Sequence, residues 1–162
     1  MPVASAVRYV GLAAAAVLLA GCTEVGDGLR SPGDPAEVCV PADAAGFATI
    51  SLDRIENVAG DAVTIVDVSL VDGHDLQVAG WYVVLGDGPT PGVDRGYEPP
   101  PVPSTEVPAG EEATLVLGLQ VGGDEGRAEA TEVTYIVRSS RPRTVRGHIA
   151  HRVVAEGAPG CF

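Results

Sequence analysis

From Phe47 onward, apolar residues recur at every second position of the chain rather than at every third or fourth. A period of two is typical of a β-strand with one buried face, whereas an amphipathic helix needs a period near 3.6. No window of the sequence carries a convincing amphipathic helix of ordinary length. The pattern therefore predicts an all-β fold.

Six segments carry the strand pattern, and they span residues 48–55, 62–71, 75–85, 112–121, 131–138 and 143–155. The Asp72-Gly73 step suits a tight hairpin turn, because both positions accept a positive φ, and residues 139–142 form the turn between the last two strands. Six or seven short strands separated by turns favour a β-sandwich over a barrel.

Two of these strands allow their faces to be assigned. In residues 112–121 the alternation is one-faced, as half-buried antiparallel strands require, and the expected inward residues are Leu115, Leu117, Leu119 and Val121. For residues 75–85 the pattern predicts one face of Leu76, Val78, Tyr82 and Val84 and an opposite face of Trp81, Val83 and Leu85.

Residues 55–77 (IENVAGDAVTIVDVSLVDGHDLQ) and 107–119 (VPAGEEATLVLGL) place turn residues directly before long β runs. In this they resemble the immunoglobulin-like β-sandwich modules of bacterial envelope proteins. The resemblance covers about residues 47–121. It implies a single immunoglobulin-like antiparallel β-sandwich of about seven strands, and it implies no particular function, because turn chemistry specifies a fold and not a site.

Residues 1–21 have the anatomy of an export signal, with Arg8 as the only charged side chain, an apolar middle and small residues at the end. Leu19-Ala20-Gly21-Cys22 resembles the lipobox of bacterial lipoproteins. That resemblance implies cleavage before Cys22 and acyl chains, such as palmitate, on the new N-terminal cysteine. Two or three chains hold a soluble domain on a membrane where one would let it leave. A plain secretory signal and an uncleaved membrane anchor stay open as alternatives, although the apolar run is short against the roughly 20 residues that span a bilayer.

The predicted organisation is a signal peptide at 1–21, a flexible tether at 22–38 and a β-sandwich domain at 39–162. The tether is rich in Gly, Pro, Asp and Ser and shows no apolar period, which is typical of a disordered linker. The domain is expected on the extracytoplasmic face of the cell membrane, held there by the lipid.

Cys39 and Cys161 remain once Cys22 carries lipid, and they lie near the two ends of the folded part. In an exported protein an even remainder of cysteines indicates a disulfide. A reactive or metal-binding thiol pair is the rival interpretation, but no CxxC spacing or nearby histidine cluster favours it. We therefore predict a Cys39–Cys161 bond.

The formal charge of −12 argues against nucleic acid as a partner, because phosphate neutralisation needs a basic surface. The last predicted hairpin nevertheless gathers five arginines, at Arg138, Arg141, Arg143, Arg146 and Arg152. One interpretation is an edge that binds phosphate or carboxylate groups of lipid or wall polymer. The favoured one is an edge whose charges deter aggregation and pair with the acidic remainder of the chain.

Residues 86–110 carry seven of the thirteen prolines in a connection of unusual length. This segment has two interpretations. One is a stiff polyproline arm around Tyr97 and residues 99–103 that a partner could grasp. The other, which we favour, is a solvated crossover between the two sheets of the sandwich.

Residues that could carry chemistry are few. His148 and His151 lie three apart, which on a strand sends them to opposite faces and away from a shared metal ion, and His74 falls in a turn. There is no Gly-x-Ser-x-Gly sequence, and the carboxylates lie mostly at turns and strand ends. The sequence therefore predicts no catalytic site, metal or cofactor. The expected function is that of an interaction or accessory module that meets a protein or polymer of the cell envelope; the alternative is a small-ligand or ion binder.

Overall fold

The computed structural model describes residues 28–86 and 92–161, so the predicted signal peptide, the lipobox and Cys22 lie outside the described residues. Within the described ranges the chain forms β-strands and no α-helix. The strands are β1 (Leu29–Arg30), β2 (Ala36–Pro41), β3 (Phe47–Asn57), β4 (Val63–Val71), β5 (Leu76–Leu85), β6 (Gly92–Arg95), β7 (Glu106–Val107), β8 (Glu112–Val121), β9 (Glu125–Ala128), β10 (Ala130–Val137), β11 (Arg143–Arg146) and β12 (Ile149–Val154). None of the described residues belongs to a helix that could cross a membrane.

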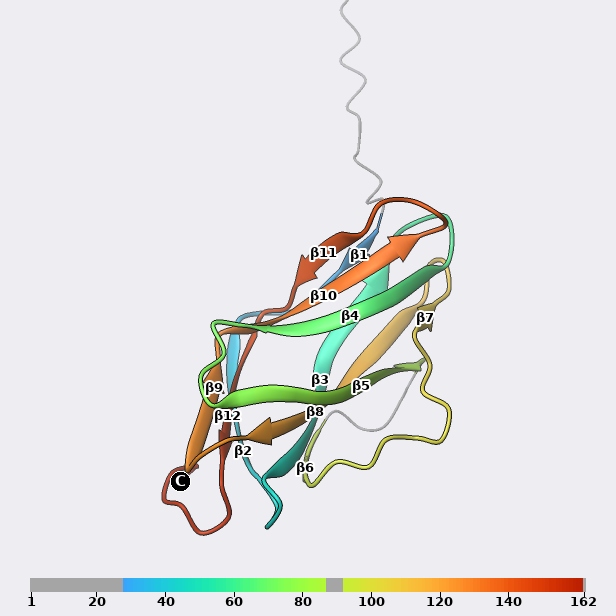
Figure 1. The fold of residues 1–162 in the computed structure, drawn as a ribbon. Coiled ribbons are helices and arrows are strands. Elements are labelled where there is room, and N and C mark those ends of the chain that lie inside the picture. The colour runs from blue at the N-terminus through green and yellow to red at the C-terminus, as the bar shows by residue number, and fades with distance from the viewer. Residues whose placement is uncertain (1–27, 87–91, 162) are drawn as a thin grey trace, which may run out of the picture.

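The strands form two layers. One layer is the sheet β1-β3-β8-β5, with β6 added alongside β3. In the other layer, β9 and β10 are successive stretches of one chain segment, and β11 and β12 are successive stretches of the next. β10 therefore pairs with β4 and β11, while β9 pairs with β12. β2 completes this layer by parallel pairing with β12. Figure 1 shows β4 and β10 side by side in front of β3.

This strand order is that of immunoglobulin domains of the constant type, whose strands A, B, E and D form one sheet and C, F and G the other. Here β1, β3, β8 and β5 stand in the first set, and β4, β9–β10 and β11–β12 stand in the second. Among the described residues, seven strands have six residues or more: β2, β3, β4, β5, β8, β10 and β12. The predicted immunoglobulin-like sandwich of about seven strands is confirmed.

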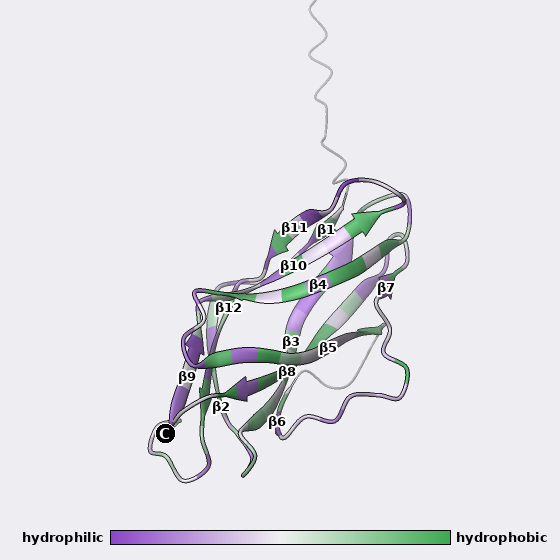
Figure 2. Ribbon diagram, in the orientation of Figure 1, coloured by the Kyte–Doolittle hydropathy of each residue, from purple (hydrophilic) through white to green (hydrophobic). Residues whose placement is uncertain are grey.

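The core lies between the layers and is built from the inward residues of the long strands. Figure 2 shows hydrophobic stretches along β4 and β5 and a hydrophilic β9 at the rim. The largest fully buried apolar side chains are Ile50, Ile55, Ile65, Leu115, Leu117, Leu119, Val40, Val63, Val107, Val116 and Val153. All of them except Val116 belong to one continuous core, to which both layers contribute.

β8 differs from the half-buried strand that its sequence predicts. Leu115, Leu117 and Leu119 are buried as expected, but Val116 on the opposite face is only 2% exposed and Thr114 is buried as well. β8 lies in the middle of its sheet, and Tyr97, which precedes it in the chain, packs on its outer face at Gly118. The prediction that only one face of this strand is buried is therefore wrong.

β5 departs from its expected faces because of an irregularity in its register. A β-bulge between Val78 and Gly80 adds a residue on β5, which offsets the alternation of side chains beyond it. Leu76 before the bulge and Val83 after it are consequently both buried. The predicted sharing of one face by Leu76 and Tyr82 is wrong.

The Asp72-Gly73 step is a turn, with Asp72 at a φ of 50°, but it does not close a hairpin. β4 pairs with β10 and β7, whereas β5 pairs with β8 in the other layer. The turn therefore carries the chain from one layer to the other. The turn predicted at residues 139–142 does join neighbouring strands, β10 and β11.

The folded part begins earlier than the predicted boundary at residue 39. Leu29 and Arg30 pair with β3, and Ala36–Pro41 runs along the full length of β12. The described part of the predicted tether thus contributes edge strand at residues 29–30 and 36–38, because backbone pairing to an existing sheet needs no apolar alternation of its own. The predicted disulfide is present: Cys39 on β2 bonds to Cys161, with the two Cα atoms 5.6 Å apart.

Candidate functional site

The proline-rich connection joins β5 to β8, which pair with each other in the same layer, so it is not the crossover between two sheets that the favoured interpretation expected. Its described residues nevertheless contact both layers. Its β6 pairs with β3 in one layer and its β7 pairs with β4 in the other. We call residues 96–105, between these two strands, the strap; it belongs to the yellow loop on the right of Figure 1. The sequence pattern missed both short strands, because residues 92–95 and 106–107 have no apolar run to mark them.

Hydrogen bonds fix the strap at both ends. At its start, the Thr49 hydroxyl donates to the Gly96 carbonyl at 2.6 Å. At its end, the Val83 amide donates to the Ser104 carbonyl at 3.0 Å and the Ile65 amide donates to the Thr105 carbonyl at 2.8 Å. Because Val83 lies on β5 and Ile65 on β4, the end of the strap bridges the two layers.

Tyr97 occupies a notch that two glycines leave in the sheet. Gly80 on β5 is the cross-strand partner of Gly118 on β8. A Cβ atom placed on Gly118 would lie 2.3 Å from Cγ of Tyr97, and one on Gly80 would lie 2.6 Å from its hydroxyl oxygen. The ring therefore fills the space of two absent side chains. Tyr97, a predicted partner contact, here packs against the chain's own sheet.

The environment of the Tyr97 hydroxyl agrees with this packing. Burial raises the pKa of Tyr97 above its ordinary value of 10.0, and the nearby Tyr82 raises that pKa further. A hydroxyl on a freely exposed arm would not lose water in this way. The strap is thus seated on the sheet at Tyr97 and leaves it again beyond that residue.

The apex of the strap, residues 98–103, faces solvent. Val102 is 85% exposed, against 46% or less for the other exposed large apolar side chains of the described residues. Proline fixes its own φ and holds the preceding residue in an extended conformation. Four of the six apex residues are prolines, so this exposed apolar segment has few conformations available to it.

Arg138 and Arg146 form ion pairs with acidic residues. Arg138 contacts Asp61 at 2.5 Å, and Arg146 contacts Glu129 at 3.3 Å. Arg141 lies exposed in the turn after β10, and Arg143 is half-buried on β11. This pairing with the acidic remainder is what the favoured interpretation of the cluster expected, and exposed pairs of this kind contribute little to stability.

Arg152, the remaining arginine of the hairpin, contacts Glu125 on the neighbouring strand β9 at 2.6 Å. Its hydrogen bond is the largest cause that lowers the pKa of Glu125 to about 2, and a second hydrogen bond from Arg127 adds to it. The same contact raises the pKa of Arg152. The two side chains therefore act as one ion pair across the β9–β12 ladder.

A buried polar cluster links β3 in one layer to β10 and β12 in the other, and sequence reasoning missed it. The Thr131 hydroxyl on β10 donates to Asp53 Oδ2 on β3 at 3.0 Å and lies 2.7 Å from His151 Nε2 on β12. All three residues are at most 4% exposed. Asp53 occupies an inward position of β3. A charged residue at an inward position of a strand was the one feature of the sequence that could have indicated this cluster.

This cluster does not have the geometry of a hydrolytic triad. In such a triad the carboxylate orients the histidine through Nδ1, whereas here Asp53 bonds to the threonine and His151 Nδ1 has no hydrogen-bond partner. The threonine hydroxyl is also closed off from solvent. The cluster acts as a polar connection between sheets, in which each bond strengthens its neighbour at low dielectric.

The other predicted histidine positions do not converge. His148 is exposed just before β12, while His151 points into the core, and His74 forms an isolated bridge with Arg127 through their backbones. In the ranges that the structure describes, no three His, Cys, Asp or Glu side chains are arranged to hold a metal ion.

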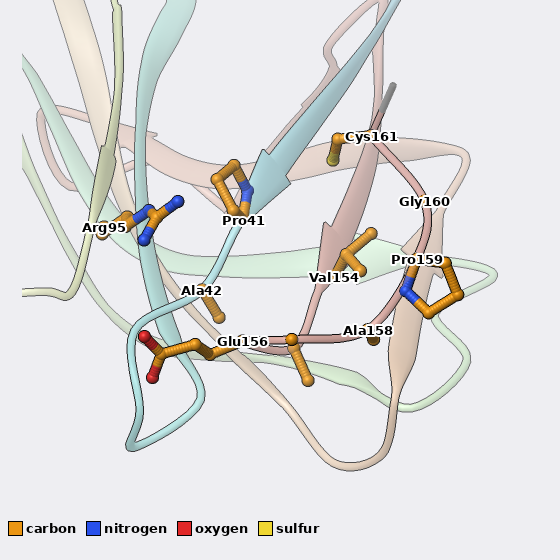
Figure 3. Close-up of a pocket in the computed structure, with 11 residues that line it drawn as sticks. Pro41, Ala42, Arg95, Val154, Glu156, Ala158, Pro159, Gly160 and Cys161 are labelled. Carbon is orange, nitrogen blue, oxygen red and sulfur yellow. The ribbon is translucent and has the colours of Figure 1, made fainter.

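An open groove of about 350 Å³ lies between the end of β2, the end of β12 and the C-terminal residues. Figure 3 shows Arg95 and Glu156 on one side of it and Pro159 and Cys161 on the other. Pro41, Ala42, Val154 and Ala158 supply the apolar part of its lining. Its size suits a small molecule, since ligand sites begin at roughly 300 Å³.

Comparison with protein families and with curated proteins found no match. Among solved structures, the chain is similar to the ASH/PapD-like domain of human CEP192 (PapD-like domain 7), with 12% sequence identity and a TM-score of 0.42. The match covers 90% of this chain and 98% of that domain. So distant a likeness leaves the function to be argued from the residues of this chain alone.

Proposed function

We propose that this protein is a non-catalytic lipoprotein of the extracytoplasmic membrane face, anchored through Cys22, that serves as an interaction module of the cell envelope. The observation that carries the proposal is the apolar run that ends in Leu19-Ala20-Gly21-Cys22, upstream of a disulfide-bonded domain. Disulfides persist in oxidising compartments outside the cytoplasm. The disulfide and the lipobox thus support the same location.

The contacts of the described polar side chains support a binding function rather than a catalytic one. The buried cluster of Asp53, Thr131 and His151 links the two layers and is closed off from solvent, and arginines of the last hairpin pair with carboxylates. Immunoglobulin-like sandwiches offer exposed sheet faces and connecting loops as contact surfaces. A protein or polymer of the envelope is therefore the expected partner.

The anchoring is tested with a Cys22→Ser variant of the full chain in its native host, beside a Thr23→Ser control. We expect the wild type and the control in the membrane fraction, with acyl chains on the peptide that begins at residue 22, and the Cys22→Ser variant outside that fraction. An unmodified Cys22, or a Cys22→Ser variant that remains with the membrane, contradicts the proposed anchor.

The interaction is tested by crosslinking both forms in cells. A partner captured by the anchored form and lost from the released one supports an accessory module. Absence of any specific partner in either form contradicts the interaction function and favours the second candidate.

The second candidate function is small-ligand binding in the groove of Figure 3. The observation that favours it is Arg95, whose guanidinium lines the groove and forms no hydrogen bond or ion pair within the described residues. A small carboxylate with an apolar body matches this lining. A panel of metabolites and metal ions in thermal melts tests it: a carboxylate should raise the melting temperature of the wild type and not that of an Arg95→Ala variant.

A further inference from the structure

The strap presents a short stretch of apolar chain to solvent, and we propose that its apex, residues 98–103, is the docking segment for a partner protein. The partner is expected to offer a groove lined by aromatic side chains and bordered by basic ones. This inference rests on the proposed interaction function and names the contact through which it works.

The first support is pre-organisation. The strap is held on one side of the apex by Tyr97 in the glycine notch and on the other by the Val83–Ser104 hydrogen bond. A loop that is already ordered loses less conformational entropy when it binds. The fold therefore removes part of the cost that a free proline-rich tail would meet.

The second support is the chemistry of the apex itself. The run Pro99-Pro100-Pro101-Val102-Pro103 exposes a valine by 85% and leaves four of its five residues without a backbone N–H donor. Such a segment cannot be recognised through a β-ladder, but its ridged apolar surface fits grooves lined by aromatic rings. Recognition of this kind uses side-chain packing and the free carbonyls.

The third support is charge. Glu98 begins the apex and Glu106 follows the strap, and both are exposed. The chain as a whole carries a formal charge of −12. Complementary charge on a partner steers association and selects against wrong partners. Basic residues are therefore expected at the border of the groove, and an anionic lipid surface is a poor match.

The test places a photoreactive benzoylphenylalanine at position 102 of the full chain in its native host. The same group at position 66 serves as the matched control, because Val66 is also an exposed valine, 46% accessible, but lies on the outer face of β4. A third probe at position 141 reports on the arginine turn. Adducts are mapped to single partner residues by mass spectrometry.

We expect a discrete adduct from position 102 whose bond maps to or beside an aromatic residue, with Lys or Arg nearby, and no such adduct from position 66. Combining Pro99→Ala and Pro101→Ala should lower its yield about fivefold or more, since loss of a central contact of about 1 kcal/mol or more changes affinity by that order. Both prolines are exposed, so the melting temperature should stay close to that of the unaltered chain and show that the fold is intact.

The inference is overturned if position 102 gives no adduct, if position 66 gives the same one, if the bond maps away from aromatic residues, or if the proline changes leave the yield unaltered. An adduct from position 141 with none from position 102 overturns the strap as the contact and leaves the interaction function standing. No adduct from any of the three positions contradicts both.

Discussion

Replacing Gly118 by alanine tests whether Tyr97 really depends on an absent side chain. The new Cβ would lie 2.3–2.5 Å from three ring carbons of Tyr97, far inside the 3.5–4.0 Å of ordinary carbon contact. β8 is held between β3 and β5, so the ring and not the backbone must move. Overpacking of this kind costs about 1–3 kcal/mol of the free energy of unfolding.

Gly118→Ala should stabilise the fold instead of destabilising it when the Tyr97 ring is removed. In a Tyr97→Ala background the three ring carbons that crowd this position are gone, and Gly118→Ala replaces a glycine within a strand, which stabilises by about 0.5–1 kcal/mol. The coupling energy between the two sites is then about 1.5–4 kcal/mol. A general intolerance of β8 to substitution would not produce this reversal.

Urea unfolding of the full chain, followed by circular dichroism, measures the four free energies. Gly123→Ala is the matched control, because nothing lies within 4 Å of its Cβ position, and it should change stability by no more than about 0.5 kcal/mol. Equal destabilisation by Gly118→Ala in both backgrounds would refute the reasoning.

Absorbance titration supplies a second readout of the same displacement. The pKa of Tyr97 should fall back toward 10.0 in Gly118→Ala, because the displaced hydroxyl regains water. In the wild type the raised pKa means that the fold favours the neutral phenol. Its contribution to stability is therefore complete below pH 10 and is lost as the pH rises through the raised value.

Three further outcomes are expected. Combining Cys39→Ser with Cys161→Ser should lower the free energy of unfolding by about 4–5 kcal/mol, given a sequence separation of 122 residues, and a loss below about 1 kcal/mol in urea would contradict this. Thr131→Val removes a hydroxyl that serves two buried partners and should cost about 1–3 kcal/mol in the same assay, whereas an unchanged midpoint would show that the cluster is not stabilising. Arg152→Gln should raise the pKa of Glu125 from about 2 toward 4.5 in an NMR titration. Because the pKa of Glu125 is lowered in the wild type, its stabilisation of the fold is present above pH 4.5 and is lost as the pH falls toward 2. The free energy of unfolding of the variant should therefore decrease less on acidification than that of the wild type.

The sequence predicted those parts of the fold that local patterns encode. The strand expected at residues 112–121 coincides with β8 residue for residue, because its leucines alternate without interruption. The Cys39–Cys161 bond was predictable because only two cysteines remain after Cys22 is assigned. The sequence could not predict that the Asp72-Gly73 turn carries the chain to the other layer. A turn sequence specifies a reversal of the chain, but it does not specify which sheet receives the next strand.

The candidate site was less predictable because it depends on register between distant strands. Asp53 and Thr131 are 78 positions apart, and Thr131 and His151 are 20 apart, so no local window contains the cluster. Gly80 and Gly118 likewise look like weak points of two separate strands until their pairing places them side by side. Only then does Tyr97 become an anchor rather than an exposed aromatic residue.

The hydrogen bonds of the strap to β5 and β4 also bear on how a partner could bind this side of the sandwich. An edge strand with unpaired amides invites another strand, and natural proteins cover or interrupt such edges. Here the carbonyls of Ser104 and Thr105 accept from the amides of Val83 on β5 and Ile65 on β4, so the strap uses one amide of each strand. The prolines that follow Glu98 cannot extend a sheet themselves. At this end of β5 and β4 the strap therefore opposes strand addition, which agrees with the proposed recognition of the proline surface.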